Sequence, residues 1–449
     1  MIFNIFNFIL SIIGPTIFGL VLINLILPRT RFYWLEFLVI GYGLGAFVIT
    51  WLMFILSWLG LNLSTILNIL FILLAASLIL IFKRCRQMMV QQEKMNLTLP
   101  TNWLKKLIVI ILVLIIILKL FLVFSGSYLR PIIQYDALAT WSLKAKIFWS
   151  NNKIIFDQTN PYFLGYHLPG YPLHLPLLEV WQASTFGRWH DGVIKIIFPI
   201  YYLGLLVLLG ANLRRQSSLL KTIVFVFFLA SLPLLIYHSR HDYADLILAF
   251  YLLATTVYTW RAIKEGNYNY GILASIFAVT SAWTKNEGFF LALIIIFSGL
   301  VYLLAQRKLR FRFLIPVSIF IILLLPWLIF KIYHHLGWEN FGSNFQLIFQ
   351  PAVLKNIFNT LTSTINWNIW WLVFVLGLAV NWRRVFAREN LFLVVIGSLI
   401  FYLFLYVFTP NADYIASGLV DQRNLLTIIP LTIFYIGLLF SNQSVKINL

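Results

Sequence analysis

Long apolar stretches recur along this chain, and they limit the folds open to it more than any other feature. A helix that spans a bilayer needs about 20 mostly apolar residues, and about thirteen stretches of the 449-residue sequence approach that length. They are residues 3–27, 35–57, 64–82, 107–124, 193–210, 219–236, 246–260, 270–283, 288–305, 313–331, 367–380, 391–408 and 425–440. We therefore expect an all-α, polytopic transmembrane helical bundle of about 13 helices.

Composition excludes the soluble alternatives. Hydrophobic residues make up 61% of the chain and charged residues only 10%, whereas a soluble domain has about 25% charged residues. A water-soluble enzyme, a disordered chain and a collagen-like fibre are excluded. The single cysteine, Cys85, excludes a disulfide within the chain. Stretch 3–27 has neither a basic start nor a small-residue cleavage site, so we expect an uncleaved helix.

Basic residues indicate how the chain is oriented. They cluster at every second boundary between apolar stretches, as the cytoplasmic face of a membrane protein requires. Of the 33 Lys and Arg residues, 21 fall on this predicted inner side, against four of the 14 acids. The net charge of +19 therefore reflects topology and contacts with membrane lipids, and nucleic acid is not an expected partner. The N-terminus is expected outside and the C-terminus inside.

The remaining ten acids lie on the predicted outer side, so we expect the chemistry there, in a cell membrane. We predict N-terminal transmembrane helices and a cytoplasmic linker in 1–104, a catalytic transmembrane domain in 105–440, and a cytoplasmic tail in 441–449. The largest outer loop is 125–192. The sequence contains no Walker loop, no GxGxxG after a strand and no HExxH, so motifs for nucleotide or zinc-protease chemistry are absent.

The first outer loop opens with a candidate catalytic acid, Asp136. The pattern of residues 137–150, which follow it, predicts a helix that lies in the membrane interface. This helix would have one apolar face, and Lys144 and Lys146 would lie off that face. The apolar face consists of Leu138, Trp141, Ala145, Phe148 and Trp149. A carboxylate at the start of such a helix is held at a fixed height above the bilayer, although Asp136 alone would also suit a simple helix cap.

A proline-rich run in the same loop, Tyr162 to Pro176, offers further candidates. Each proline removes a backbone donor and restricts the preceding residue, so the run is not expected to be regular helix. It would aim His167, Tyr171 and His174 toward a substrate, or these rings would simply belong to an interfacial aromatic belt.

Residues 238–245 form a short and unusually polar outer connection. Arg240, His241, Asp242 and Asp245 are its candidate substrate-binding residues. Both acids would also suit helix caps. Together with histidines, two or three carboxylates would be able to hold a divalent cation, but the spacing does not decide whether a metal is bound, and we predict no certain cofactor.

Two later outer connections place charges close to the hydrocarbon. Stretch 270–283 is only about 21 Å long as a helix, so Lys285 and Glu287 are expected to turn inside the membrane outline, where ionisable residues usually have a function. A pair that only closes the turn is the alternative. Arg423, at the mouth of the last helix, suits bidentate capture of a phosphate, or it snorkels to headgroups.

These motifs, in this order, resemble the integral-membrane C-type glycosyltransferases, a superfamily that includes protein O-mannosyltransferases and lipid A aminoarabinose transferases. The resemblance covers roughly residues 105–435. It rests on Tyr135-Asp136-Ala-Leu with Trp141 and Lys144-Ala-Lys146, on Tyr166-His-Leu-Pro-Gly-Tyr-Pro-Leu-His-Leu-Pro-Leu-Leu178, on Tyr243-Ala-Asp-Leu-Ile-Leu-Ala-Phe-Tyr251, on Thr284-Lys-Asn-Glu-Gly288, and on Arg423-Asn-Leu-Leu-Thr-Ile-Ile-Pro430.

The resemblance implies inverting transfer of a sugar from a polyprenyl-phosphate donor to a lipid, glycan or protein hydroxyl on the extracytoplasmic face. Asp136 would activate the hydroxyl, and Asp245 would match the acid of the second loop, with Asp242 as a less certain partner. Lys285 and Arg423 would hold the carrier phosphate. Ala137 follows Asp136 where protein O-mannosyltransferases carry an Asp-Glu pair, which argues against a protein acceptor.

Other functions compete with this expectation. A transporter or flippase for a lipid-linked anion would also be polytopic, but it usually has two related halves and a site near the midplane, and no internal repeat is evident. An O-antigen ligase or polymerase would also use a polyprenyl-linked donor, yet would carry its large loop late in the chain. A non-catalytic assembly factor would need no convergence of acids and cations.

Overall fold

The computed structural model describes residues 2–27, 30–90, 92–339, 349–351, 353–385, 389–409 and 421–441. The described chain is almost entirely helical. Its one small sheet pairs β1 (Phe32–Tyr33) in parallel with β2 (Gln92–Glu93). The predicted all-α fold class is therefore confirmed. The predicted tail beyond Ser441 lies outside the described residues.

The helices before the centre of the chain are α1 (Ile2–Ile26), α2 (Trp34–Trp58), α3 (Leu63–Val90), α4 (Trp103–Leu129), α5 (Tyr135–Ala139), α6 (Trp141–Asn151), η1 (Phe163–Gly165), α7 (His174–Phe186), α8 (Asp191–Lys195), α9 (Ile197–Arg214), α10 (Leu219–Ala230) and α11 (Pro233–His238). Those that follow are α12 (Ala244–Glu265), α13 (Tyr268–Thr284), α14 (Asn286–Ala305), η2 (Phe311–Phe313), α15 (Leu314–Tyr333), α16 (Val353–Thr362), α17 (Thr364–Trp367), α18 (Trp370–Val380), α19 (Trp382–Val385), α20 (Glu389–Phe408) and α22 (Asp421–Leu439).

The helix count agrees with the sequence in part. Each of the thirteen apolar stretches overlaps helical residues, although 219–236 is divided between α10 and α11, and ten helices of the described chain are long and apolar enough to cross a membrane. The other three, α10, α13 and α18, have 12, 17 and 11 residues. The chain is thus a multi-pass membrane protein, and thirteen spans remains a prediction.

Helix α12 forms the centre of the bundle. Every residue from Ala244 to Tyr258 is buried, because α9, α13, α14 and α22 pack around it. A helix that is apolar on all sides needs such a position. Its 22 residues span about 33 Å, close to the hydrocarbon thickness of a bilayer. Polar clusters therefore gather at its two ends, with Asp245 at one and Arg261 and Glu265 at the other.

The first three helices are attached to this bundle. α1 and α2 approach so closely that a Cβ on Gly19 would lie 1.8 Å from the carbonyl oxygen of Gly41, a contact that only glycine permits and that is common between membrane helices. α2 in turn packs on α7 and α9. The predicted division near residue 104 stays a prediction, since both parts contribute to one hydrophobic core.

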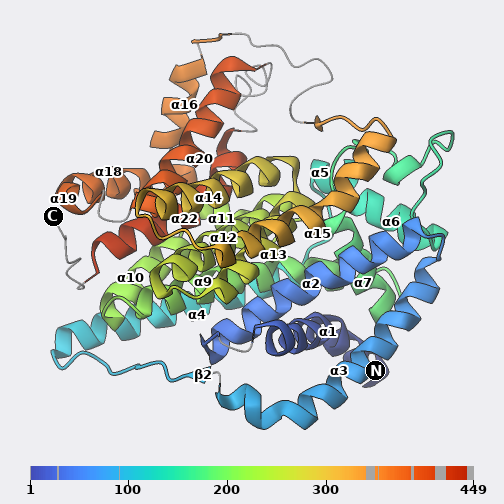
Figure 1. The fold of residues 1–449 in the computed structure, drawn as a ribbon, viewed down its shortest axis with the longest axis horizontal. Helices are drawn as coiled ribbons and strands as arrows, with labels where there is room; N and C mark the ends of the chain where they lie inside the picture. Colours follow the sequence, from blue (N-terminus) through green and yellow to red (C-terminus); the bar gives the residue numbers. More distant parts are fainter. Residues whose placement is uncertain are drawn as a thin grey trace.

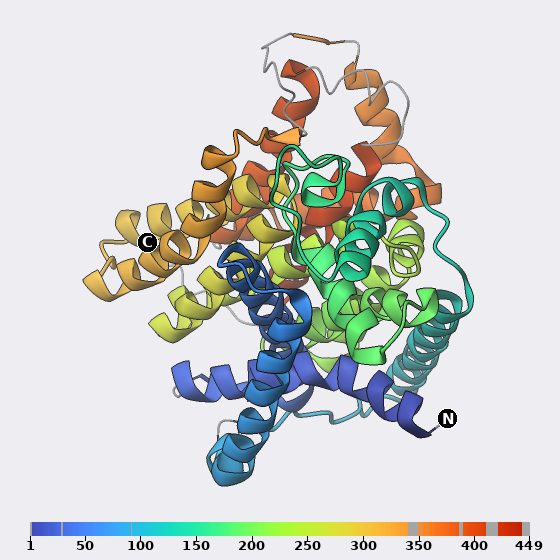
Figure 2. The ribbon, with the colours of Figure 1, turned by 90° about the vertical axis from the view of Figure 1, so that its right-hand side faces the viewer.

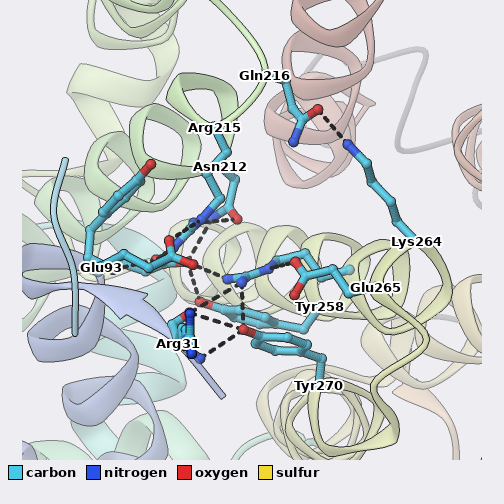
Figure 3. Close-up of polar contacts among 12 residues, drawn as sticks. Arg31, Glu93, Asn212, Arg215, Gln216, Tyr258, Lys264, Glu265 and Tyr270 are labelled. Atoms are coloured by element: carbon cyan, nitrogen blue, oxygen red, sulfur yellow. Dashed lines mark hydrogen bonds and ion pairs between the residues drawn. The ribbon is translucent and has the colours of Figure 1, made fainter. Parts of the chain in front are cut away.

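A buried carboxylate fastens α2 to the end of α12 that is predicted to face inward. Glu36 is fully buried and accepts hydrogen bonds from Arg215 Nη2 at 2.6 Å, Tyr258 Oη at 2.9 Å and Asn212 Nδ2 at 3.0 Å. Arg261 Nη1 lies 3.5 Å from it. Figure 3 shows Arg215, Asn212 and Tyr258 converging at this cluster. Several predicted inner basic residues thus meet in one place, at a helix end far from Asp245.

The first outer loop folds over the opposite end of the bundle. α5 and α6 lie at the right of Figure 1, opposite α10 and α19, and Figure 2 shows residues 130–190 lying across the bundle when it is viewed from that end. The predicted helix over 137–150 is interrupted, because Thr140 leaves helical geometry (φ −133°, ψ −72°) between α5 and α6. Asp136 therefore lies on a separate short helix.

Two details of the loop differ from expectation. Lys144, predicted off the apolar face, is fully buried, because its Nζ donates to the carbonyl of Leu168 at 2.7 Å and needs no water. The proline-rich run is non-helical apart from the short η1 turn as far as Leu173, but α7 begins at His174. Pro176 lies in the first turn of α7, where a missing N–H costs nothing.

Candidate active site

Five charged side chains from distant parts of the sequence form one continuous chain of ion pairs. Arg423 Nη2 lies 2.7 Å from Asp136 Oδ2 and 3.1 Å from Asp245 Oδ2. Lys285 Nζ lies 2.8 Å from Asp245 Oδ1 and 3.3 Å from Glu287 Oε1. Acids and cations therefore alternate, and all five residues come from the predicted outer connections. The structure brings together five of the eleven candidates.

The local sequence explains how these side chains meet. Asp245 lies in the first turn of α12, where the helix dipole favours a carboxylate. Lys285 is the extended residue between α13 and α14. A Cβ on Gly288 would lie 2.0 Å from the carbonyl oxygen of Ser281, so glycine is what allows the tight turn that aims Lys285 and Glu287 at Asp245.

The chain of ion pairs is buried at one end and accessible at the other. Side-chain exposure is 0% for Asp245, 6% for Lys285 and 1% for Glu287, but 23% for Arg423 and 31% for Asp136. Arg423 also lies over the ring of Tyr243, 4.5 Å from its centre. The buried charges hold each other in place, whereas Asp136 and Arg423 can be reached by a substrate.

Tyr171, another candidate, lies beside this chain. Its side chain is buried, and burial together with the nearby carboxylate of Glu287 raises its pKa. Its ring packs on Trp141 at 5.1 Å. Tyr171 therefore enters the site as a neutral phenol.

The three histidine candidates occupy other surroundings. His174 is fully buried; its Nδ1 lies 2.8 Å from Thr50 Oγ1 and its Nε2 lies 3.2 Å from Tyr251 Oη. Burial lowers its pKa to about 3. His167 Nδ1 lies 3.1 Å from Thr140 Oγ1, beside the break that follows Asp136. His241 Nδ1 lies 2.8 Å from the carbonyl oxygen of Tyr237, and burial lowers its pKa to about 4.

The other two candidates, Arg240 and Asp242, also lie outside the chain of ion pairs. Arg240 packs against α4, since a Cβ on Gly126 would lie 3.0 Å from Arg240 Cδ. Asp242 is fully buried and accepts a hydrogen bond from Ser142 at 3.3 Å.

Three neighbours of the site were not among the eleven candidates. His238 Nδ1 lies 3.9 Å from Asp245 Oδ2, and Tyr243 supports Arg423. Lys331 Nζ donates to the carbonyl of Gly170 at 2.9 Å and to Asn286 Oδ1 at 3.3 Å. The sequence did contain an indication for Lys331. It lies at the predicted outer end of a span, whereas lysines are usually enriched at the cytoplasmic end.

A metal site is not evident among the residues that the structure describes. They contain no group of three or more His, Cys, Asp or Glu side chains that suits a metal ion. In the site each carboxylate is paired with a cation instead. The divalent cation considered from the sequence remains a prediction.

Comparison with solved structures identifies the architecture. No protein-family model and no curated protein matches the chain. The structure of ArnT from Cupriavidus metallidurans in the apo state superposes with a TM-score of 0.53 and 12% identity, and the undecaprenyl phosphate complex of the same protein with 0.52 and 14%. Each match covers 75% of this chain and 60% of the ArnT chain.

The chain shares the fold of ArnT. ArnT is a lipid A aminoarabinose transferase, from one of the groups that the sequence motifs resemble, so the resemblance is confirmed at the level of the fold. The chain spans about 60% of the length of the ArnT structures, and low identity leaves activity and substrates to be argued from the site.

Proposed function

We propose that this protein is an inverting membrane glycosyltransferase that moves a sugar from a polyprenyl-phosphate donor to an acceptor hydroxyl on the extracytoplasmic face. The observation that carries the proposal is the accessible pair of Asp136 and Arg423 at the end of the buried chain of ion pairs. The ArnT fold supports it, because an ArnT structure contains undecaprenyl phosphate.

The chemistry needs a base and a cation, and this pair supplies both. A carboxylate oxygen of Asp136 takes the proton of the acceptor hydroxyl, as a general base does. The hydroxyl oxygen attacks the anomeric carbon from the face opposite the phosphate, and the bond from that carbon to the phosphate oxygen breaks. The electron pair leaves with the phosphate, and the configuration inverts. Arg423 and Lys285 stabilise the charge that grows on the phosphate.

The resting ion pair suggests an order of events. Arg423 is bound to Asp136 in the structure, at 2.7 Å, so the base is engaged before a donor arrives. A donor phosphate that takes over the guanidinium would release Asp136 toward the acceptor. Asp245 would keep Arg423 oriented throughout, since it is fully buried and also holds Lys285.

Arg423→Ala tests the phosphate contact. We expect the apparent KM for the lipid donor to rise about 10- to 100-fold, because a charge-assisted hydrogen bond contributes about 1.5–3 kcal/mol. Transfer assays in membranes with varied donor would measure it. Arg188→Ala is the matched control, since Arg188 is an exposed arginine of the same outer loop that packs on Phe186. An unchanged KM for Arg423→Ala would favour the snorkelling alternative.

Cysteine labelling tests the sidedness of the site. In a Cys85→Ser background, Asp157→Cys in the first outer loop and Lys308→Cys between α14 and α15 place single thiols on exposed residues. A membrane-impermeant maleimide should label position 157 on intact cells, and position 308 only after permeabilisation. The reverse pattern would contradict the proposed orientation.

Transport of a lipid-linked anion, the alternative from another class, fits the geometry less well. The charged chain lies at the first turn of α12, at one end of a helix about 33 Å long, whereas transporter sites lie near the midplane. An O-antigen ligase or polymerase would share the donor chemistry and differ in its acceptor.

A further inference from the structure

Behind the ion-pair chain lies a second pair of acids that the proposed chemistry does not use. Glu179 on α7 and Asp242, just before α12, are both fully buried. The hydroxyl of Ser142 on α6 lies 3.3 Å from Asp242 Oδ2 and also interacts with Glu179. Both acids lie outside the ten helices of the described residues that are long and apolar enough to cross a membrane.

The polar atoms of this pair are poorly satisfied. Within the described chain, three of their four carboxylate oxygens have no hydrogen-bond partner of good geometry. These are both oxygens of Glu179 and Oδ1 of Asp242. Two ionised carboxylates in this state would lose hydration without replacing most of it by hydrogen bonds, and neighbouring like charges cannot both ionise easily. The arrangement is stable only if at least one acid keeps its proton.

The surrounding charges do not remove this need. Among the described residues, Asp191 and Lys195, both from α8, are the charged groups that act on the pair. Lys195 directs its Nζ to the carbonyls of Pro131 and Arg240, at 3.2 and 3.4 Å. Burial dominates: it raises the pKa of Asp242 to about 7 and that of Glu179 well above its usual range, where Asp242 adds to the effect.

The pair joins the two segments that carry the proposed active-site acids. Ser142 lies six residues after Asp136, across the break at Thr140, and Asp242 lies three residues before Asp245. On the accessible side Arg423 bridges Asp136 and Asp245 by ion pairs. On the buried side Ser142 and Asp242 join the same two segments.

We propose that Glu179 and Asp242 share a proton near neutral pH and that, because this proton avoids repulsion between two buried charges, the pair keeps the segment that carries Asp136 packed against the segment that carries Asp245. They are positioning residues, because they act through Ser142 and the backbone and do not touch the reacting atoms. The positioning role rests on the proposed function; the shared proton does not.

The effect of pH follows from the direction of the shifts. Because the pKa of Asp242 is about 7 in the folded protein and about 4 in an unfolded chain, folding favours the protonated pair. This contribution to stability is fully present below about pH 4 and is lost as the pH rises through about 7. Stability should therefore fall between about pH 5 and pH 8.

Neutral isosteres test the shared proton without reference to sugar transfer. The thermal midpoint of the purified wild-type protein should fall by a few degrees from about pH 6 to pH 8, whereas Asp242→Asn and Glu179→Gln should flatten this slope. Asp157→Asn, a change of an exposed acid in the same loop, should keep the wild-type slope. Equal slopes in all four proteins would overturn the proposal. So would stabilisation of the wild type alone by Mg²⁺ or Ca²⁺ at pH 8, which would indicate a bound cation.

Activity tests the positioning role separately. Wild-type transfer should fall about ten-fold from pH 6 to pH 8, since a group with pKa 7 is about one tenth protonated at pH 8. Asp242→Asn should keep its activity over this range and Asp242→Ala should not. If the variants fail to fold, infrared spectra of the wild type still decide, because the carbonyl absorption of protonated buried acids must decrease between these pH values as Asp242 ionises. A pH-dependent midpoint with pH-independent transfer would reject only the positioning role.

Discussion

Asp136→Asn is expected to lower the rate of sugar transfer about 10²- to 10⁴-fold, the usual contribution of a general base. Asparagine has nearly the same shape as aspartate but cannot take the proton of the acceptor hydroxyl. It also loses the ion pair with Arg423, 2.7 Å long in the structure. Because Asp136 is partly exposed, with 31% of its side chain accessible, we expect expression and thermal midpoint to be nearly unchanged. Transfer in membranes supplied with donor and acceptor measures the effect.

Asp157→Asn is the matched control for this prediction. Asp157 lies in the same outer loop and is exposed, and the backbone N–H and hydroxyl of Thr159 donate to its carboxylate at 2.9 and 2.7 Å. It should keep wild-type activity. If Asp136→Asn retains full activity, Asp136 is not the base.

Glu36→Gln is expected to lower the free energy of unfolding by about 3–5 kcal/mol, the usual effect of removing one partner of a buried ion pair. Glutamine keeps the size of the side chain but removes the charge that compensates Arg215 and Arg261, which are 10% and 1% exposed. The loss should appear as a lower midpoint in thermal or denaturant unfolding of the purified protein.

Glu93→Gln provides the comparison, because Glu93 pairs with the same arginine. Its carboxylate lies 2.9 Å from Arg215 Nη2, but its side chain is 29% exposed, and exposed ion pairs contribute about 1 kcal/mol or less. Figure 3 shows Glu93 and Arg215 in the same cluster. Equal losses for Glu36→Gln and Glu93→Gln would contradict the role given to burial.

Much of the fold could be predicted because the bilayer leaves few choices. Apolar stretches of about 20 residues form helices in a membrane, and every predicted stretch overlaps helical residues. Predictions from local sequence were wrong where a contact between distant residues decides the structure. Lys144 was expected off the apolar face, but a carbonyl of the proline-rich run satisfies its ammonium group, and Thr140 interrupts a pattern that reads as one helix.

The active-site candidates were harder to assemble from sequence. Residue type and predicted side of the membrane selected Asp136, Asp245, Lys285, Glu287 and Arg423, yet 287 positions separate Asp136 from Arg423. One sequence gives no register between such distant segments. His174 was predicted as a substrate-binding residue but lies in the core. Its hydrogen-bond partners, Thr50 and Tyr251, belong to distant helices, and the sequence around His174 does not indicate these contacts. Glu179 was not predicted as a functional residue, because Asp242, the acid beside it in the fold, lies in a distant part of the sequence.

The central claim is that this protein transfers a sugar from a polyprenyl-phosphate carrier. Mass spectrometry of lipid-linked sugars and cell-envelope glycans, with and without the gene, tests it most directly. Without the gene, one polyprenyl-phosphate sugar should accumulate and the matching sugar should be missing from a glycan or lipid. The wild-type gene should restore both and Asp136→Asn should restore neither. Unchanged levels of lipid-linked sugars and of every envelope glycan would contradict the account.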